Sequence, residues 1–466
     1  MLQKLSLIII PFIFISCVSA PKTKKIDIGL VAPEEWTAGK STVGKIDSLW
    51  WQRFGDARLD TIVAEARGQN FNLKAAVAQL DAAMAQAKIA GASMYPQLNA
   101  SMNASRRKQN FIGFPIPGAP DQVLSTTINT YSPSLNLSWE LDLWGRVRSG
   151  KSAALADVQA SQADLAGAQL SLTAQVCKSW FAAIEAKRQV ELARATSQSY
   201  RISSEQVQDR YERGLRRSLD VRLSLSNTAT AEAVHSQRQA QYDAIVRQLE
   251  ILMARYPDAS LVLSPDLPAL SDDIPEGLPA DLIARRPDVV AAERRLVASD
   301  ARIRQAKAAL YPQISLTGSA GTSTNELGEI LNGDFSVWSL IGNLLQPLFQ
   351  GGRLRAGVDL AKSQSKAALA QYGQAVLNAY REVETALANE RFLKERQRAL
   401  ETATAQSVAA RQLAEDQYAN GIIDLITMLD AQRSAFNSES QLLTVRRERL
   451  DARIDVYLAL GGGFSR

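Results

Sequence analysis

Residues 70–96 read NFNLKAAVAQLDAAMAQAKIAGASMYP, and residues 286–312 read RPDVVAAERRLVASDARIRQAKAALYP. The two stretches align without gaps, 216 residues apart, and a glutamine follows each of them. In both, apolar residues recur at helical spacing in alanine-rich sequence, which predicts a helix that ends near Tyr95 or Tyr311. One structural plan therefore occurs twice in this chain.

Two later matches show that the duplication continues. The segment Gly145 to Gly150 (GRVRSG) matches Gly352 to Gly357 (GRLRAG), and Tyr211-x-x-Gly214 matches Tyr418-x-x-Gly421. Both matches are 207 residues apart, so the second copy has a shorter connection between its first helix and its GRLRAG segment.

After each predicted helix the period of the apolar residues changes to two, as in a strand with one apolar face. The predicted strands are 97–105 and 134–143 in the first copy, and 313–321 and 335–346 in the second, where Ile341 interrupts the alternation. The intervening segments, 106–133 with its prolines and 322–334 with its glycines, are predicted to be loops. Such strand pairs are typical of a transmembrane β-barrel.

The stretches after the second strand of each pair favour long helices. No proline occurs in residues 134–256 or 348–466, and each stretch is interrupted by one glycine signal, Gly214 or Gly421. Each is predicted to be a helical hairpin, and one arm, residues 146–214, would be about 100 Å long.

These patterns divide the chain into consecutive segments. The predicted segments are a signal peptide, 1–16; an N-terminal anchor and equatorial segment, 17–60; a first repeat, 61–256, with its helical hairpin at 146–256; a proline-rich linker, 257–287; a second repeat, 288–460, with its hairpin at 352–460; and a tail, 461–466.

The N-terminus has the pattern of an export signal. Lys4 precedes an apolar run from Leu5 to Ile15, which is too short to span a bilayer stably. Cys17 follows Ser16 and resembles the lipobox cysteine of bacterial lipoproteins, which carries diacylglycerol and an N-acyl chain. The alternative is an ordinary signal peptide cleaved near Ala20.

Composition argues against several other classes of protein. The 53 basic and 48 acidic residues are spread along the chain, so no basic stripe indicates nucleic-acid binding. His235 is the single histidine and has no nearby nucleophile motif, and neither a metal-ligand cluster nor a phosphate-binding loop is present. We therefore predict that the chain is not an enzyme and holds no metal or other cofactor.

Four amphipathic strands cannot close a barrel, and an open sheet edge cannot face lipid because its backbone groups would lack hydrogen-bond partners. Several copies must therefore share one barrel, and three copies would supply twelve strands. The alternative is a long coiled-coil lipoprotein with a scaffolding role. That alternative explains the helices but not the two strand pairs at matching positions.

A set of short motifs resembles the TolC-like outer-membrane factors, in particular the NodT-type lipoproteins, over essentially the whole mature chain. The motifs are Trp50-Trp51-x-x-Phe54-x-Asp56, Asp142-x-x-Gly145-Arg146, Arg285-Arg286-Pro287-Asp288 with Ala292-Glu293, the two Tyr-Pro-Gln turns, the two Tyr-x-x-Gly turns, Leu429-Asp430-Ala431-Gln432-Arg433, and Gly461-Gly462-Gly463.

The resemblance implies a mainly α fold with a membrane β part: a homotrimer with a 12-stranded β-barrel in outer-membrane lipid and a long periplasmic α-helical barrel. It implies a lipid-anchored outer-membrane duct through which drugs or other small molecules leave the cell. The implied partners are a periplasmic membrane-fusion adaptor and an inner-membrane pump of the resistance-nodulation-division class. The same duct could instead serve protein secretion or metal efflux.

The resemblance also suggests site residues. The hairpin turns would dock the adaptor, through Tyr211, Gly214, Leu215 and Asp220 in the first turn and Tyr418, Gly421 and Ile422 in the second. Just beyond the second turn, Ile426 would form an apolar ring that closes the resting duct. Asp430 and Arg433 would form ion pairs between neighbouring chains; the alternative is a surface pair at i,i+3 within one chain.

Overall fold

The computed structural model describes residues 29, 36–38, 47–113, 123–270 and 285–464. These residues divide into two compact units. The sheet unit comprises Asp81–Gln159 and Arg294–Ala370, and the hairpin unit comprises Asp27–Leu80, Ala160–Glu293 and Gln371–Arg466. The signal peptide and Cys17 lie outside the described residues.

The order of elements repeats, as the duplicated sequence predicts. The first copy contains α1 (Ala57–Gln69), α2 (Phe71–Ala92), β1 (Gln97–Phe111), β2 (Leu124–Leu141), α3 (Arg146–Glu212) and α4 (Ser218–Leu252). The second contains α6 (Pro287–Ala308), β3 (Gln313–Thr322), β4 (Ser336–Leu345), α7 (Arg353–Ala419) and α8 (Leu425–Ala459). Short 3₁₀ turns, Trp50–Phe54, Leu327–Glu329 and Gly333–Phe335, complete the described elements. Both α3 and α7 have 67 residues, and both α4 and α8 have 35.

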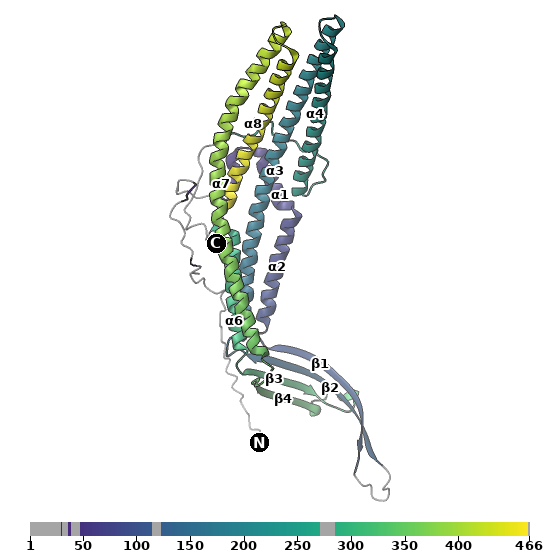
Figure 1. The fold of residues 1–466 in the computed structure, drawn as a ribbon. Coiled ribbons are helices and arrows are strands. Elements are labelled where there is room, and N and C mark those ends of the chain that lie inside the picture. Colours follow the sequence, from purple (N-terminus) through teal and green to yellow (C-terminus); the bar gives the residue numbers. More distant parts are fainter. Residues whose placement is uncertain (1–28, 30–35, 39–46, 114–122, 271–284, 465–466) are drawn as a thin grey trace. The chain divides into compact units, whose positions relative to one another are not determined.

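In the sheet unit, the strands form one antiparallel sheet in the order β1-β2-β3-β4 (Figure 1). Asp142 begins the Asp-x-x-Gly-Arg motif. Its side chain accepts hydrogen bonds from the backbone N–H groups of Val147 and Arg148 at the start of α3 (3.0 and 2.7 Å). Arg146 forms an ion pair with Glu140. These contacts fix the step from β2 into the long helix.

The loop predicted at residues 106–133 is largely wrong. β1 continues to Phe111 and β2 begins at Leu124, so paired strand replaces most of that segment. Residues 106–110 are all polar, and alternation of polar and apolar residues therefore could not reveal the extension. Strand β3 is one residue longer at its end than predicted, and β4 is one residue shorter at each end.

The core of the hairpin unit is aromatic. Trp50 stacks on Tyr457 with ring centroids 5.1 Å apart, and Phe54 meets the edge of Phe181 at the same distance. Asp56 caps α1 and also accepts a hydrogen bond from the indole of Trp180 (2.8 Å). The Trp-Trp-x-x-Phe-x-Asp motif thus joins the N-terminal segment to α3 and α8.

The four long helices of the hairpin unit lie in a fixed order. Ser204 of α3 contacts Ser224 of α4 (3.2 Å), and Thr404 of α7 donates to the carbonyl of Ser438 on α8 (3.1 Å). Other polar contacts join α3 directly to α8. The order across the layer is α4-α3-α8-α7, with α4 and α7 at its edges (Figure 1). None of the described helices is both long and apolar enough to span a membrane.

Candidate functional site: the hairpin tips

The two hairpin turns have the same backbone construction. Gly214 and Gly421 follow α3 and α7 with φ of +75° and +74°, the left-handed region that favours glycine. The N–H of Leu215 bonds to the carbonyl of Arg210 (2.8 Å), and that of Ile422 bonds to the carbonyl of Gln417 (2.9 Å). Each glycine therefore ends its helix and turns the chain back, which is its structural role whether or not a partner binds.

Most of the predicted tip residues lie on the surface. Leu215 is 69% exposed, Ile422 is 70% exposed and Tyr211 is 44% exposed. Both glycines are exposed, and Asp220 is half-buried in the first turn of α4. Two large apolar side chains at the ends of parallel hairpins, both facing solvent, are suited to binding another protein.

Tyr418 requires a correction, because its side chain is only 1% exposed and offers no surface to a partner. The ring packs in a small cluster with Val207, Leu425 and Met428. The Arg210 and Arg216 guanidinium groups lie 5.2 and 4.9 Å from its centroid, a cation–π arrangement. The sequence pattern could not show which face of α7 turns toward α3.

Arg210 is a tip residue that sequence reasoning missed. Its guanidinium donates to the carbonyls of Tyr418 (3.3 Å) and Ala419 (2.9 Å), at the C-terminal end of α7. The last carbonyls of a helix have no partner within that helix. A cation at this end also interacts favourably with the negative end of the helix dipole. Arg210 thereby joins the first hairpin to the second at their tips.

The three predicted gate residues share an exposed face of α8. Ile426 is 57% exposed. The Arg433 Nη2 atom lies 2.8 Å from Asp430 Oδ1 within the same chain, and both side chains are mostly exposed. The described chain therefore forms the i,i+3 pair that was the alternative to ion pairs between chains.

Gln432 holds the opposite face of α8 and was also missed. It is 4% exposed, and its Nε2 atom donates to Glu415 Oε1 on α7 (2.9 Å) and to Ser203 Oγ on α3 (3.3 Å). A buried amide bonded to two neighbouring helices fixes the rotation of α8. That rotation turns Ile426, Asp430 and Arg433 toward solvent.

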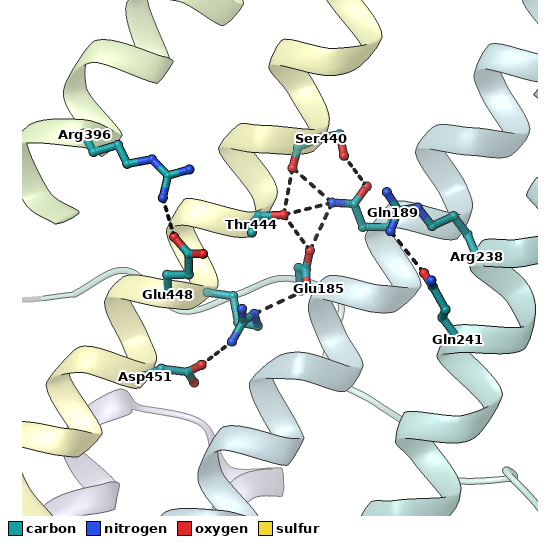
Figure 2. Close-up of polar contacts among 10 residues, drawn as sticks. Glu185, Gln189, Arg238, Gln241, Arg396, Ser440, Thr444, Glu448 and Asp451 are labelled. Atoms are coloured by element: carbon teal, nitrogen blue, oxygen red, sulfur yellow. Dashed lines mark hydrogen bonds and ion pairs between the residues drawn. The ribbon is translucent and has the colours of Figure 1, made fainter. Parts of the chain in front are cut away.

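Farther along the helices from the tips, polar side chains join α3 to α8 (Figure 2). Gln189 Nε2 donates to the carbonyl of Ser440 (3.0 Å), and Thr444 Oγ1 donates to Glu185 Oε1 (3.0 Å). Arg447 lies between two carboxylates, because it pairs with Glu185 (3.4 Å) and with Asp451. The two hairpins therefore meet along a polar seam in this region.

Asp451 has an unusual environment in this seam. Burial raises the pKa of its carboxyl to about 6, which Arg447 and Lys178 oppose and Asp455 and Glu185 reinforce. One carboxylate oxygen, Oδ1, is buried without a hydrogen-bond partner. Among the described residues, no three His, Cys, Asp or Glu side chains are grouped to hold a metal ion.

Comparison with known proteins identifies the class. The family model for outer membrane efflux proteins matches residues 62–255 and 278–462. The outer membrane protein OprJ of Pseudomonas aeruginosa is 34% identical over 458 residues, which cover 96% of this chain and 93% of OprJ. The pyoverdine export outer membrane protein OpmQ of the same species is 30% identical over 475 residues, which cover 99% of this chain and 97% of OpmQ.

Among solved structures, the open state of the MtrE outer membrane channel of Neisseria gonorrhoeae matches with a TM-score of 0.82 and 28% identity. The match covers 97% of this chain and 99% of that one. The fold is thus that of an outer-membrane channel with two long helical hairpins per chain, as the sequence predicted. The chain belongs to the outer membrane efflux protein family and acts in the outer membrane as a channel for efflux.

Proposed function

We propose that three copies of this chain form one closed duct, the exit of a tripartite efflux system. The main observation behind this proposal is that the described sheet has a strand with one unpaired side at each edge. Among the strands that the structure describes, β1 and β4 each pair on one side only, and every residue of β4 is exposed. An open sheet edge is not stable in lipid, so neighbouring copies must pair β4 with β1.

The long helices also form a layer with two end members. In the order α4-α3-α8-α7, α4 and α7 are the end members among the four long helices that the structure describes. Three copies would close both layers with one rotation, giving twelve strands in the membrane and twelve helices in the periplasm. A symmetric ring of three copies thus forms a duct that one chain cannot form alone.

The tips are the proposed contact with the rest of the pump. Leu215 and Ile422 are exposed apolar side chains there, and we assign them to a periplasmic membrane-fusion adaptor that joins the duct to a resistance-nodulation-division pump. Tyr211, Asp220 and the two glycines shape the same surface. Tyr418 contributes from inside, by holding the two turns together.

We propose that the duct is closed at rest by α8. Three copies of Ile426 around one axis would form an apolar constriction, and Asp430 and Arg433 would exchange partners between chains in the assembled trimer. Supporting this role, both side chains are exposed and already in bonding geometry.

The proposed duct also has a transported substrate and a lipid anchor. The cargo is a small molecule that crosses passively and without covalent change, whereas a duct for protein secretion or metal efflux remains the second candidate. The relative OpmQ, which is named for pyoverdine export, favours the first. Cys17 carries the diacylglycerol and N-acyl chains that anchor the protein to the outer membrane, as its lipobox pattern indicates.

Native mass spectrometry of detergent-purified protein, expressed with its own signal, tests assembly and anchor together. We expect a trimer of chains that begin at an acylated Cys17. A trimer of chains that begin near residue 21 would refute the anchor alone. A monomer or dimer would refute the shared duct.

A further inference from the structure

The sheet has one apolar and one polar face, and the strand register shows how far the apolar face extends. Cross-strand partners share a face, and every second residue along a strand returns to it. On β2 the residues of this face are Leu141, Trp139, Leu137, Leu135, Pro133 and Tyr131. Their partners on the neighbouring strands are mostly apolar as well, such as Leu98, Ala100 and Met102 on β1.

The height of this apolar face matches a membrane. From Leu141 to Tyr131 the strand rises about 34 Å at about 3.4 Å per residue. With a strand tilt of about 40° the face is about 26 Å tall, close to the band of about 25 Å that is typical of outer-membrane barrels. Tyr131 is then at the level of the aromatic girdle, where the hydrocarbon region ends.

Two cations come next on the same face. Arg106 pairs with Asn129 and Lys108 with Thr127, one and two rows beyond Tyr131. The opposite residues are neutral, and both cations are exposed. Within the described part of the chain, neither cation has an ion pair. These charges therefore lie just beyond the apolar band, toward the end of β1 that is farther from its connection to α2.

We propose that Arg106 and Lys108 bind the phosphate groups of the anionic glycolipid in the outer leaflet of the outer membrane. This proposal rests on the proposed function, because the lipid-facing orientation of the apolar face follows from the closed barrel. Long cationic side chains reach toward the headgroup level while their methylene groups stay against apolar surface. Arginine can also bond two phosphate oxygens at once.

The strand contains its own control. Arg107 lies between the two cations but on the opposite, polar face, where its partner is Ile128. It has the same charge and the same height as its neighbours, and it is exposed. In a closed barrel it faces the lumen, so its removal changes the net charge without changing the lipid-facing surface.

The test measures binding of diphosphoryl lipid A to the detergent-purified trimer by native mass spectrometry. In wild-type protein, monophosphoryl lipid A should bind more weakly than the diphosphoryl form. The double variant R106Q/K108Q should bind diphosphoryl lipid A about 30-fold more weakly, since each cation near an anionic lipid surface contributes about 1 kcal/mol. The R107Q variant should bind it like wild-type protein.

Equal losses in R107Q and R106Q/K108Q would overturn the proposal, because net charge and not the lipid-facing surface would then decide binding. Unchanged binding in the double variant would overturn it too. The same preparations give the trimer mass and the conductance in planar bilayers. A conducting trimer without selective lipid binding refutes this inference alone, whereas loss of the trimer in wild-type protein refutes the proposed function.

Discussion

The pKa of Asp451 depends on the packing of the two hairpins against each other. Its position on α8 gives it Arg447 one turn earlier, but Glu185 and Lys178 come from α3. Burial against α3 outweighs the two cations and raises the pKa of the carboxyl to about 6. The ionised form is therefore less stable in the folded protein than in the unfolded chain.

We expect Asp451→Asn to stabilise the protein at pH 7 but not at pH 3.5. Below the ordinary aspartate pKa the carboxyl is protonated in both states, and asparagine resembles that form. As the pH rises through about 6, wild-type protein loses the stability that protonation supplies, whereas the variant does not. The loss is roughly 1 to 3 kcal/mol for a pKa raised to about 6.

The measurement for Asp451 is the midpoint of thermal unfolding in detergent, at one protein concentration, between pH 3.5 and pH 7.5. The difference between variant and wild type should rise from near zero to a positive value over that range. A difference that is constant with pH would show that the environment does not raise this pKa.

At the scale of elements, the pairing of β2 with β3 depends on a close approach at one end. Gly321 lies opposite Ser134, next to Pro133, and an added Cβ would meet the Pro133 carbonyl oxygen at 2.1 Å. Backbone fills that space, so no side-chain movement can relieve the contact. By contrast, a Cβ at Gly318 on the same strand meets its neighbours at ordinary distances of 3.5 Å or more.

We expect Gly321→Ala to destabilise the sheet by roughly 1 to 3 kcal/mol, as overpacking in a core does. The matched Gly318→Ala variant should stay close to wild type. The readout is the temperature at which the oligomer dissociates in detergent. Equal shifts in the two variants would mean that the close approach at Gly321 does not limit the register of β2 and β3.

At the scale of the whole molecule, the proposed resting gate depends on charges that meet only after assembly. In one chain, Asp430 and Arg433 are an exposed pair worth a few tenths of a kcal/mol. Around one axis, three copies would bring several such groups close together in a narrow space. Their contribution to closure is then a property of the trimer and not of the helix.

Replacing both Asp430 and Arg433 with alanine should raise the ion conductance of single channels in planar bilayers several-fold, because the long side chains no longer bridge the constriction. Asp359 and Lys362 form a comparable i,i+3 pair on α7 (3.2 Å) and supply the control when both become alanine. Unchanged conductance in the D430A/R433A variant would refute the gate assignment.

The sequence alone determined the duplication, the helix and strand order and the two glycine turns. All of these depend on local periodicity or on residues with special backbone freedom, which act within a few positions of each other. The resemblance of the motifs to the TolC-like outer-membrane factors implied the fold class and the efflux function, and both are confirmed by the family and its solved structures.

Only the tertiary structure decided which faces meet. It buried Tyr418 beside Arg210 and Arg216, placed Gln432 of α8 against α3 and α7, and brought Asp451 of α8 to Glu185 of α3. It also extended β1 through Arg106 and Lys108. Contacts between residues hundreds of positions apart, and strand pairing without an apolar face, leave no periodic trace in the sequence; they are fixed when the chain packs.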